Sequence, residues 1–256
     1  MKVIPVRTER IEAGCDLVDL LLNRLSEMGV ELQDGDIILV ADKAISHAQG
    51  RFVDLSTIKP SNEAVRLAEE SSLEPEFAEV VLREADAVIG TSLRTILTVK
   101  NGNLVANAGV DHKNAPPGCA ALWPEDPNRE ARDLAMEVRR RTGKLVGVII
   151  VDSRLSPLRR GTTGFALGMY GFIGIRDYRG RRDLFGRRIL VTTLNVADDL
   201  AAAGHVYMGE GRELTPFVII RGAPVEMGGF DPEDLKISPK ECAYFSPIAR
   251  MMTDEP

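Results

Sequence analysis

The chain has 256 residues, enough for one large domain or two modest ones with a proper hydrophobic core. Hydrophobic residues make up 44% and charged residues 27%, the usual balance of a globular protein. The net charge of -6 argues against nonspecific nucleic-acid binding, which depends on a cationic surface. Three scattered cysteines fit neither a zinc site nor a disulfide framework, and no apolar stretch suits a signal peptide or a membrane span. We therefore expect a cytoplasmic protein without nucleic-acid or membrane partners.

The first half of the chain contains helical and strand patterns in an irregular order. Leucines spaced along one face predict a helix over residues 16–28, and Gly29 is a plausible stop. Residues 36–40 predict a strand. A helix is expected from residue 60 with Ser61 as its cap, and helical character continues over 75–85. Residues 95–99 and 104–106 flank Asn101-Gly102, which predicts a β-hairpin.

The clearest helix of the second half covers residues 127–142, because Asp126 can cap it, Pro127 suits its first position and Gly143 follows its end. Strands are predicted at 146–151, 189–194 and 217–220, with a helix at 196–204. After residue 224 we expect a partly irregular tail. Strands and helices do not alternate regularly, so the sequence predicts an α+β fold with a mixed, partly antiparallel sheet and flanking helices.

Two aspartates each follow an apolar run. Asp152 comes directly after residues 146–151, and Asp111 comes after residues 104–110. Carboxylates at strand ends lie where loops gather and ligands bind. Two such hard oxygen ligands suit Mg²⁺ or Mn²⁺ together with substrate phosphates. The alternative is that each aspartate simply opens a turn.

Further candidate residues follow other predicted elements. Lys43, after the 36–40 strand, could place a positive charge on a phosphate, with Ser46 or His47 as hydrogen-bond partners. Glu210, between two glycines, could be another metal ligand, although Gly-Glu-Gly is also an ordinary loop. A Gly-rich P-loop and a Gly-x-Gly-x-x-Gly fingerprint are both absent, and no arrangement of residues indicates a protein nucleophile.

Residues 159–188 interleave eight arginines with seven glycines. Glycine lets backbone amides approach an anion, and arginine binds phosphate or carboxylate through two hydrogen bonds. The run therefore favours an anionic ligand, with Arg159 and Arg160 as the better candidates because they lie soon after Asp152. A solvated surface or a subunit contact is the alternative.

Taken together, these segments resemble one family, the coenzyme F420 γ-glutamyl ligases, from about residue 3 to residue 222. The matching motifs in the first half are Ile4-Pro-Val6, Gly35-Asp36, Ser46-His-Ala-Gln-Gly50 and Asn107-Ala-Gly-Val-Asp111 with Asn114. Those in the second half are Val148-Ile-Ile-Val-Asp152, Arg159-Arg-Gly161, Gly164-Phe-Ala-Leu-Gly168, Asp177-Tyr178, Gly180-Arg-Arg-Asp183, Gly186-Arg187, Val196-Ala-Asp198 and Met208-Gly-Glu-Gly211. We accordingly expect residues 1–222 to form the catalytic unit as a single functional domain, with two subdomains as the alternative, and residues 223–256 to be a C-terminal tail of unknown role.

The resemblance implies a GTP-dependent ligase that adds L-glutamate to the precursor of a deazaflavin coenzyme through an acyl phosphate. It implies two divalent cation sites for Mg²⁺ or Mn²⁺ and an intertwined homodimer. Whether a monovalent cation such as K⁺ also binds is left open by the resemblance. Asp111 and Asp152, the expected catalytic residues, would bind one divalent cation, while Ser153 and Glu210 would bind the second. The residues expected at the nucleotide are Thr8, Glu9, Arg10, Ile11, Asp42, Lys43, His47, Asn114, Met208, Gly209 and Gly211. The last three belong to a loop that runs from Met208 to Pro216, and the whole loop is expected to contact the nucleotide.

Three features depart from the family pattern. The family commonly has a lysine where this chain has His47, which could remove one phosphate-side charge or make it depend on pH. The usual Asp-Thr-x-Gly-Arg reads here as Asp152-Ser-Arg-Leu-Ser156, so Leu155 and Ser156 replace the glycine and arginine. Residues 224–256 match nothing we know in the family.

Three functions compete on this basis. The first is the glutamate ligase, and the second is a paralogous metal- and nucleotide-dependent amide ligase that acts on a different acceptor or amine. The third is a guanine-nucleotide-binding or regulatory protein without ligase activity. Because Asp111, Asp152 and Glu210 are all retained, the first two readings are favoured over the third.

Overall fold

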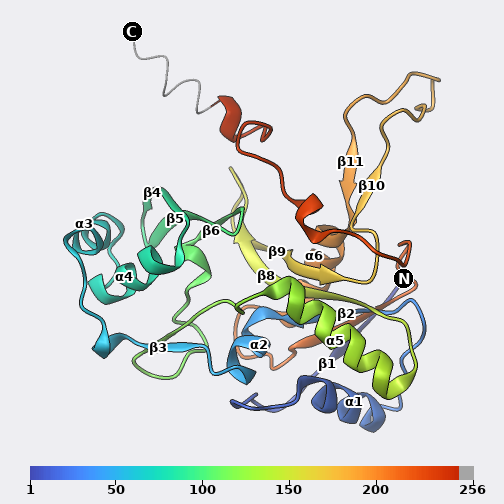
Figure 1. Cartoon of the computed structure of the whole chain (residues 1–256), viewed down its shortest axis with the longest axis horizontal. Coiled ribbons are helices and arrows are strands. Elements are labelled where there is room, and N and C mark those ends of the chain that lie inside the picture. Colours follow the sequence, from blue (N-terminus) through green and yellow to red (C-terminus); the bar gives the residue numbers. More distant parts are fainter. Residues whose placement is uncertain (248–256) are drawn as a thin grey trace.

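A five-stranded mixed sheet forms the centre of the computed structural model, which describes residues 1–247 (Figure 1). Only β2 and β8 are parallel, and every other neighbouring pair in this sheet is antiparallel. The strands, in spatial order, are β1 (Lys2–Val6), β12 (Phe217–Arg221), β2 (Ile37–Ala41), β8 (Gly147–Leu155) and β9 (Thr162–Tyr170).

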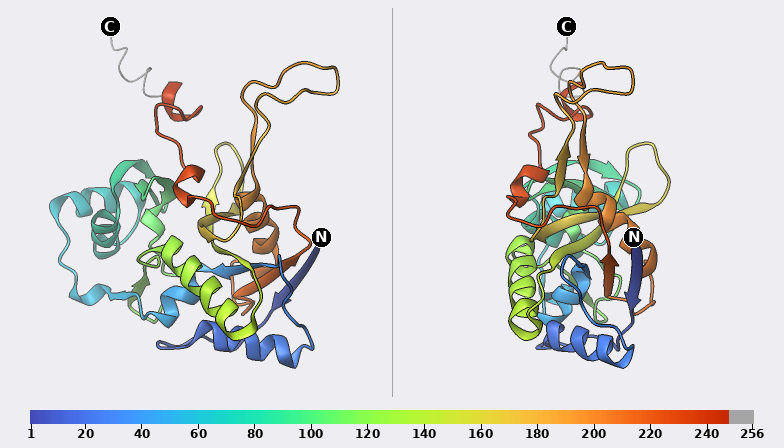
Figure 2. Two further views of the ribbon diagram at one scale, coloured as in Figure 1. Left: turned by 45° about the vertical axis from the view of Figure 1, so that its right-hand side comes forward. Right: turned by 90° about the vertical axis from the view of Figure 1, so that its right-hand side faces the viewer.

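Helices cover both faces of this sheet, and the alternation of side chains along the strands explains why (Figure 2). On β2, Ile38 and Val40 join the core under α1 (Leu17–Glu27) and α5 (Pro127–Thr142). Ile37 and Leu39 face the opposite way, toward α6 (Val196–Met208). A strand that is apolar on both faces therefore lies between two helical layers. The short helix α2 (Asp42–Ala48) follows β2 directly.

A smaller lobe, built from segments between residues 52 and 122, has its own apolar core centred on the buried Phe77 (left in Figure 1). Its helical elements are η1 (Leu55–Thr57), α3 (Asn62–Ser71), α4 (Pro75–Glu84) and η2 (Asn107–Gly109). Its strands are β3 (Phe52–Asp54), β4 (Ala87–Ser92), β5 (Thr95–Lys100), β6 (Asn103–Ala106) and β7 (Cys119–Ala121).

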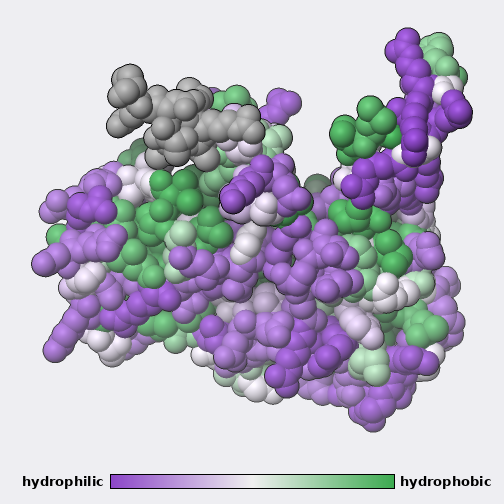
Figure 3. Space-filling view, turned by 45° about the horizontal axis from the view of Figure 1, so that its top comes forward, coloured by the Kyte–Doolittle hydropathy of each residue, from purple (hydrophilic) through white to green (hydrophobic). Residues whose placement is uncertain are grey.

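Two segments lie outside these layers. The arm formed by β10 (Ile175–Asp177), β11 (Thr193–Asn195) and the loop between them stands clear of the body, with hydrophobic and hydrophilic residues on its surface (Figure 3). The segment 222–235, which follows β12, runs across the molecule and includes η3 (Pro232–Leu235). It is docked, because Met227 forms a β-bridge with Phe172 and the amide of Ile173 donates to the carbonyl of Glu226.

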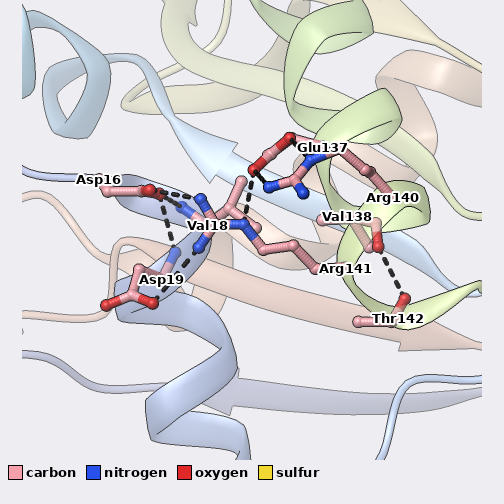
Figure 4. Close-up of polar contacts among 8 residues, drawn as sticks. All are labelled: Asp16, Val18, Asp19, Glu137, Val138, Arg140, Arg141 and Thr142. Atoms are coloured by element: carbon pink, nitrogen blue, oxygen red, sulfur yellow. Dashed lines mark hydrogen bonds and ion pairs between the residues drawn. The ribbon is translucent and has the colours of Figure 1, made fainter.

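An ionic cluster ties α1 to α5 (Figure 4). The guanidinium of Arg141 on α5 contacts Asp16, which caps α1, and lies 3.3 Å from Asp19 on the first turn of α1. Glu137, one turn earlier on α5, accepts hydrogen bonds from Arg140 at 2.7 Å and from Arg141 at 2.6 Å. The run of arginines that the sequence places at the end of this helix therefore has a specific partner on α1.

The predicted α+β class with a mixed sheet is confirmed, as are the two best-marked helices. Asp126 caps α5, and Asn101-Gly102 forms the predicted hairpin turn with both residues at positive φ. The predicted strand 189–194 is wrong over most of its length, because only residues 193–195 pair and the preceding residues belong to the exposed arm. Among residues 1–247, no helix combines the length and apolar character needed to cross a bilayer.

Candidate active-site cleft

The candidate site lies at one edge of the central sheet, where four of its strands begin or end. The parallel register pairs Ala41 with Val151, so Asp42 and Asp152, which follow them, lie next to each other. The antiparallel register pairs Val6 and Val40 with Phe217, which brings the loops before β12 and after β1 to the same edge. Sheet topology therefore gathers segments that are far apart in sequence, such as those of Val6 and Phe217.

These loops enclose a cleft with a cavity volume of about 580 Å³. The fifteen residues expected at the metals or at the nucleotide all line it, whereas Ser46, Arg159 and Arg160 do not. The acidic and hydroxyl candidates are Asp111, Asp152, Ser153 and Glu210, and the remaining ones are Thr8, Glu9, Arg10, Ile11, Asp42, Lys43, His47, Asn114, Met208, Gly209 and Gly211. The structure brings these residues together, and their individual roles stay predictions.

Neither metal-site aspartate lies where the sequence places it. Asp152 lies within β8, which continues through Leu155, because β9 pairs with it as far as Thr162. Asp111 comes two residues after η2 and forms an isolated bridge with Ala121 of β7. Both carboxylates nevertheless face the cleft, so the expectation of strand-end residues is wrong while the shared location holds.

The inner wall of the cleft is a compact charge cluster. The Lys43 ammonium lies 2.8 Å from a carboxylate oxygen of Asp42, and both side chains are largely buried. Burial, together with the negative charge of Asp42, raises the pKa of Asp152 to about 7. Burial by itself would lower the pKa of Lys43, but Asp42 and Asp152 outweigh it and hold that pKa above its ordinary value. In this wall, the positive charge of Lys43 therefore offsets part of the negative charge of the neighbouring carboxylates.

Glu210 also lines the cleft, just after α6 ends at Met208. It accepts hydrogen bonds from the Lys113 ammonium at 2.9 Å and from the Thr162 hydroxyl at 2.5 Å, and His205 lies 3.2 Å away. Although burial opposes it, the hydrogen bonds from Thr162 and Lys113 lower the pKa of Glu210 to about 2. Glu210 is therefore an ionised carboxylate at neutral pH, and it forms an ion pair with Lys113.

The side chains in this cleft fit a divalent cation in chemistry. In residues 1–247, no three His, Cys, Asp or Glu side chains are grouped closely enough to hold a metal ion. However, Mg²⁺ usually takes only one or two carboxylates and completes its shell with water and substrate phosphates. Asp111, Asp152, Ser153 and Glu210 offer hard oxygen atoms facing the same space, which is compatible with such binding once phosphates are present.

The rim of the cleft is made of linked loops. The amide of Thr8 donates to the carbonyl of Leu214 at 2.9 Å, which joins the N-terminal loop to the loop before β12. Asn114 donates through its side chain to the carbonyl of Gly211, and its own carbonyl lies 2.7 Å from His47 Nε2. These bonds tie together the four segments expected at the nucleotide: the N-terminal loop, α2, the loop of Asn114 and the loop before β12.

The eight arginines of residues 159–188 lie outside the cleft lining. Six of them follow residue 175, on the arm and its loop. Conversely, no local motif marked Lys113 and His205, which also line the cleft, whereas Arg212 belongs to the loop of residues 208–216 that was expected at the nucleotide. Lys113 could only have been found by its position two residues after Asp111.

Comparisons with known proteins identify the family of this chain. Residues 5–222 match the family model described as F420-0:Gamma-glutamyl ligase. The chain therefore belongs to that family of ligases. Proteins named coenzyme F420:L-glutamate ligase are similar to it: one from Methanopyrus kandleri is 40% identical over 90% of each chain. Those from Methanocaldococcus jannaschii (41% identical over 82% of this chain and 84% of that protein) and Archaeoglobus fulgidus (38% identical over 88% and 89%) are similar as well.

Proposed function

We propose that this protein is a GTP-dependent ligase that adds L-glutamate to the deazaflavin precursor F420-0. One observation carries the proposal: the sheet edge directs Asp42, Lys43, Asp111, Asp152 and Glu210 into a single cleft, in a chain whose residues 5–222 match the family model. The relatives named above, which are about 40% identical, supply the choice of substrates.

The proposed reaction has two steps. A carboxylate of the acceptor attacks the γ-phosphorus of GTP, which forms an acyl phosphate and releases GDP. The amine of glutamate then attacks the acyl carbon, so that the amide forms, inorganic phosphate leaves and the amine loses a proton. Such phosphoryl transfer depends on positioning and charge neutralisation more than on a protein nucleophile, in keeping with a cleft rich in charges.

The residues of the cleft divide this work. The Lys43 ammonium, held by Asp42, would stabilise negative charge on the phosphates, and the loops from Thr8 and from Met208 to Pro216 would enclose the nucleotide. Asp111 and Asp152 would hold one divalent cation, Mg²⁺ or Mn²⁺, and Ser153 with Glu210 a second. When bound, these cations would neutralise charge on the transferring phosphoryl group. The proposal assigns no residues to a monovalent cation such as K⁺.

A paralogous amide ligase with another acceptor is the second candidate. The observation that favours it is the exposed Leu155 at the end of β8, in the segment where the family pattern has a glycine. A different side chain there would change what the acceptor meets as it enters beside Asp152. Residues 1–222 are proposed as the catalytic unit in either case, and the tail after residue 222 as an addition to it.

Mass spectrometry of a reaction mixture tests the proposal. Purified protein is mixed with GTP, Mn²⁺, L-glutamate and F420-0, and we expect the acceptor to gain glutamate. Asp152→Asn, which keeps the size of the side chain but removes its charge, should reduce the rate at least 100-fold. GTP turnover only with another acceptor would favour the paralogous ligase, and nucleotide binding without turnover would contradict both.

A further inference from the structure

Trp123 is the only tryptophan in the chain, and it lies against the inner wall of the cleft. It follows β7 and is 1% exposed, within the core that packs under α1 and α5. Alternation along β8 turns Asp152 toward this same face, because Val148 and Ile150 belong to that core as well. A large buried aromatic residue and a carboxylate that lines the cleft are therefore adjacent.

The contact between these two residues is a direct hydrogen bond. The indole Nε1–H of Trp123 donates to Oδ2 of Asp152 at 2.6 Å, and the backbone amide of Ser153 donates to Oδ1 at 2.7 Å. Each carboxylate oxygen thus has one donor within the protein, while its other lone pairs remain for groups in the cleft. The indole N–H is a donor only, so its bond fixes the direction in which Oδ2 points.

The indole ring is itself held on several sides. A Cβ atom at Gly109 would lie 2.2 Å from the ring, so the backbone of η2 packs directly on it. The Lys100 ammonium lies 5.3 Å from the ring centroid, and the backbone carbonyl of Trp123 accepts from Arg51 at 2.7 Å. This packing does not by itself require a hydrogen bond to a carboxylate, because a ring of the same size without an N–H group would fill the same space.

We propose that Trp123 is a positioning residue that orients Asp152 for a divalent cation in the cleft, and that its fluorescence reports occupancy of that site. The inference rests on the proposed function, since it assumes that Asp152 binds a metal. Partners that orient a metal-binding side chain commonly change metal affinity or activity by 10- to 100-fold when they are removed.

An isosteric replacement tests the N–H alone. Because the chain has one tryptophan, growth with β-(3-benzothienyl)alanine in a tryptophan auxotroph replaces Trp123 only, and sulfur takes the place of the N–H. Binding of Mn²⁺ in the presence of GTP is measured by calorimetry for this protein, for Trp123→Phe and for the unmodified protein. We expect Mn²⁺ affinity to fall about 10- to 100-fold in both altered proteins. In the unmodified protein, Mn²⁺ should quench tryptophan emission over the same concentration range as it binds.

Phe172→Leu is the matched control, because Phe172 is also fully buried but packs on Gly147, the first residue of β8, five residues before Asp152. It should lower thermal stability while leaving Mn²⁺ affinity within about twofold, which separates positioning from a general loss of core packing. If the unmodified protein binds Mn²⁺ and the benzothienyl protein binds it equally well, the role of Trp123 is overturned while the proposed function stands. If the unmodified protein binds no Mn²⁺ with GTP, both are overturned.

Discussion

Single side chains in the cleft are held by contacts that a linear motif does not reveal. Asp152 is fixed by the Trp123 indole and by the backbone of Ser153, while Glu210 is held by Lys113 and Thr162. These partners are 29, 1, 97 and 48 residues away in sequence. The aspartates and Glu210 could be predicted because they stand in recognisable motifs. Trp123, Lys113 and Thr162 could not be predicted as their partners, because only the fold brings them together.

The close approach of η2 to Trp123 gives a stability prediction. Gly109→Ala would place a methyl group 2.2 Å from the ring in a residue with φ of 71°. Overpacking of this kind costs about 1–3 kcal/mol, in addition to the cost of the positive φ. Urea unfolding measures the loss of free energy, and tryptophan emission in the native state should shift as the ring moves.

Gly118→Ala is the control for that substitution. Gly118 has a similar φ of 77°, but an added Cβ would meet no atom within 4 Å. Gly118→Ala should therefore lower the free energy of unfolding only by the cost of placing alanine at a positive φ. Equal losses at the two positions would show that Gly109 is required for its φ and not for contact with Trp123.

Secondary-structure elements were predicted best where local signals mark both ends. Helix α5 has a cap, a proline and a terminal glycine in sequence, and its bounds agree with the structure. β8 was predicted too short, because its polar half is paired with β9 and a pairing partner leaves no local trace. β1, α2 and β9 were not predicted. Strand β9 was missed because its glycines were interpreted only as part of an anion-binding run, although residues 164–169 are buried.

The ionic cluster between α1 and α5 predicts a pH dependence of stability. Hydrogen bonds from Arg140 and Arg141 lower the pKa of Glu137 to about 2 from an ordinary value of 4.5 (Figure 4). Because the folded-state pKa is the lower one, the stabilisation is present above pH 4.5 and is lost as the pH falls toward 2. Glu137→Gln should therefore weaken the decline of the unfolding free energy over this interval.

Urea unfolding at a series of pH values from 6 to 2.5 measures this decline. Glu125→Gln, which changes an exposed carboxylate outside the cluster, serves as the control and should keep the decline of the unmodified protein. A decline in Glu137→Gln as steep as that in the control would show that the cluster contributes nothing to acid sensitivity.

At the scale of the whole molecule, the feature that the sequence described least well is the arm. Its arginines and glycines suggested an anionic ligand near Asp152, but the fold carries most of them away from the cleft. The loop of the arm also exposes four large apolar side chains: Leu184, Phe185, Leu190 and Val191. Exposed apolar residues gathered on a projecting segment are typical of a protein contact. This exposure supports the proposal of an intertwined homodimer.

Light scattering during gel filtration tests that proposal. The unmodified protein should have twice the chain mass of 28.0 kDa, and Phe185→Glu should shift the mass toward one chain, because a charge is costly in an apolar contact. Leu93→Glu introduces the same charge at an exposed leucine of the small lobe and should leave the mass unchanged. A single-chain mass for the unmodified protein at all concentrations would contradict the dimer.

The most direct test of the proposed function follows oxygen atoms through the reaction. Acceptor labelled with ¹⁸O in its carboxylate is incubated with the protein, GTP, Mn²⁺ and L-glutamate, and both the amide product and the released phosphate are analysed by mass spectrometry. Activation as an acyl phosphate predicts one ¹⁸O atom in phosphate for each amide bond formed. Amide formation with unlabelled phosphate would contradict the acyl phosphate, and GTP hydrolysis without any amide would contradict the ligase itself.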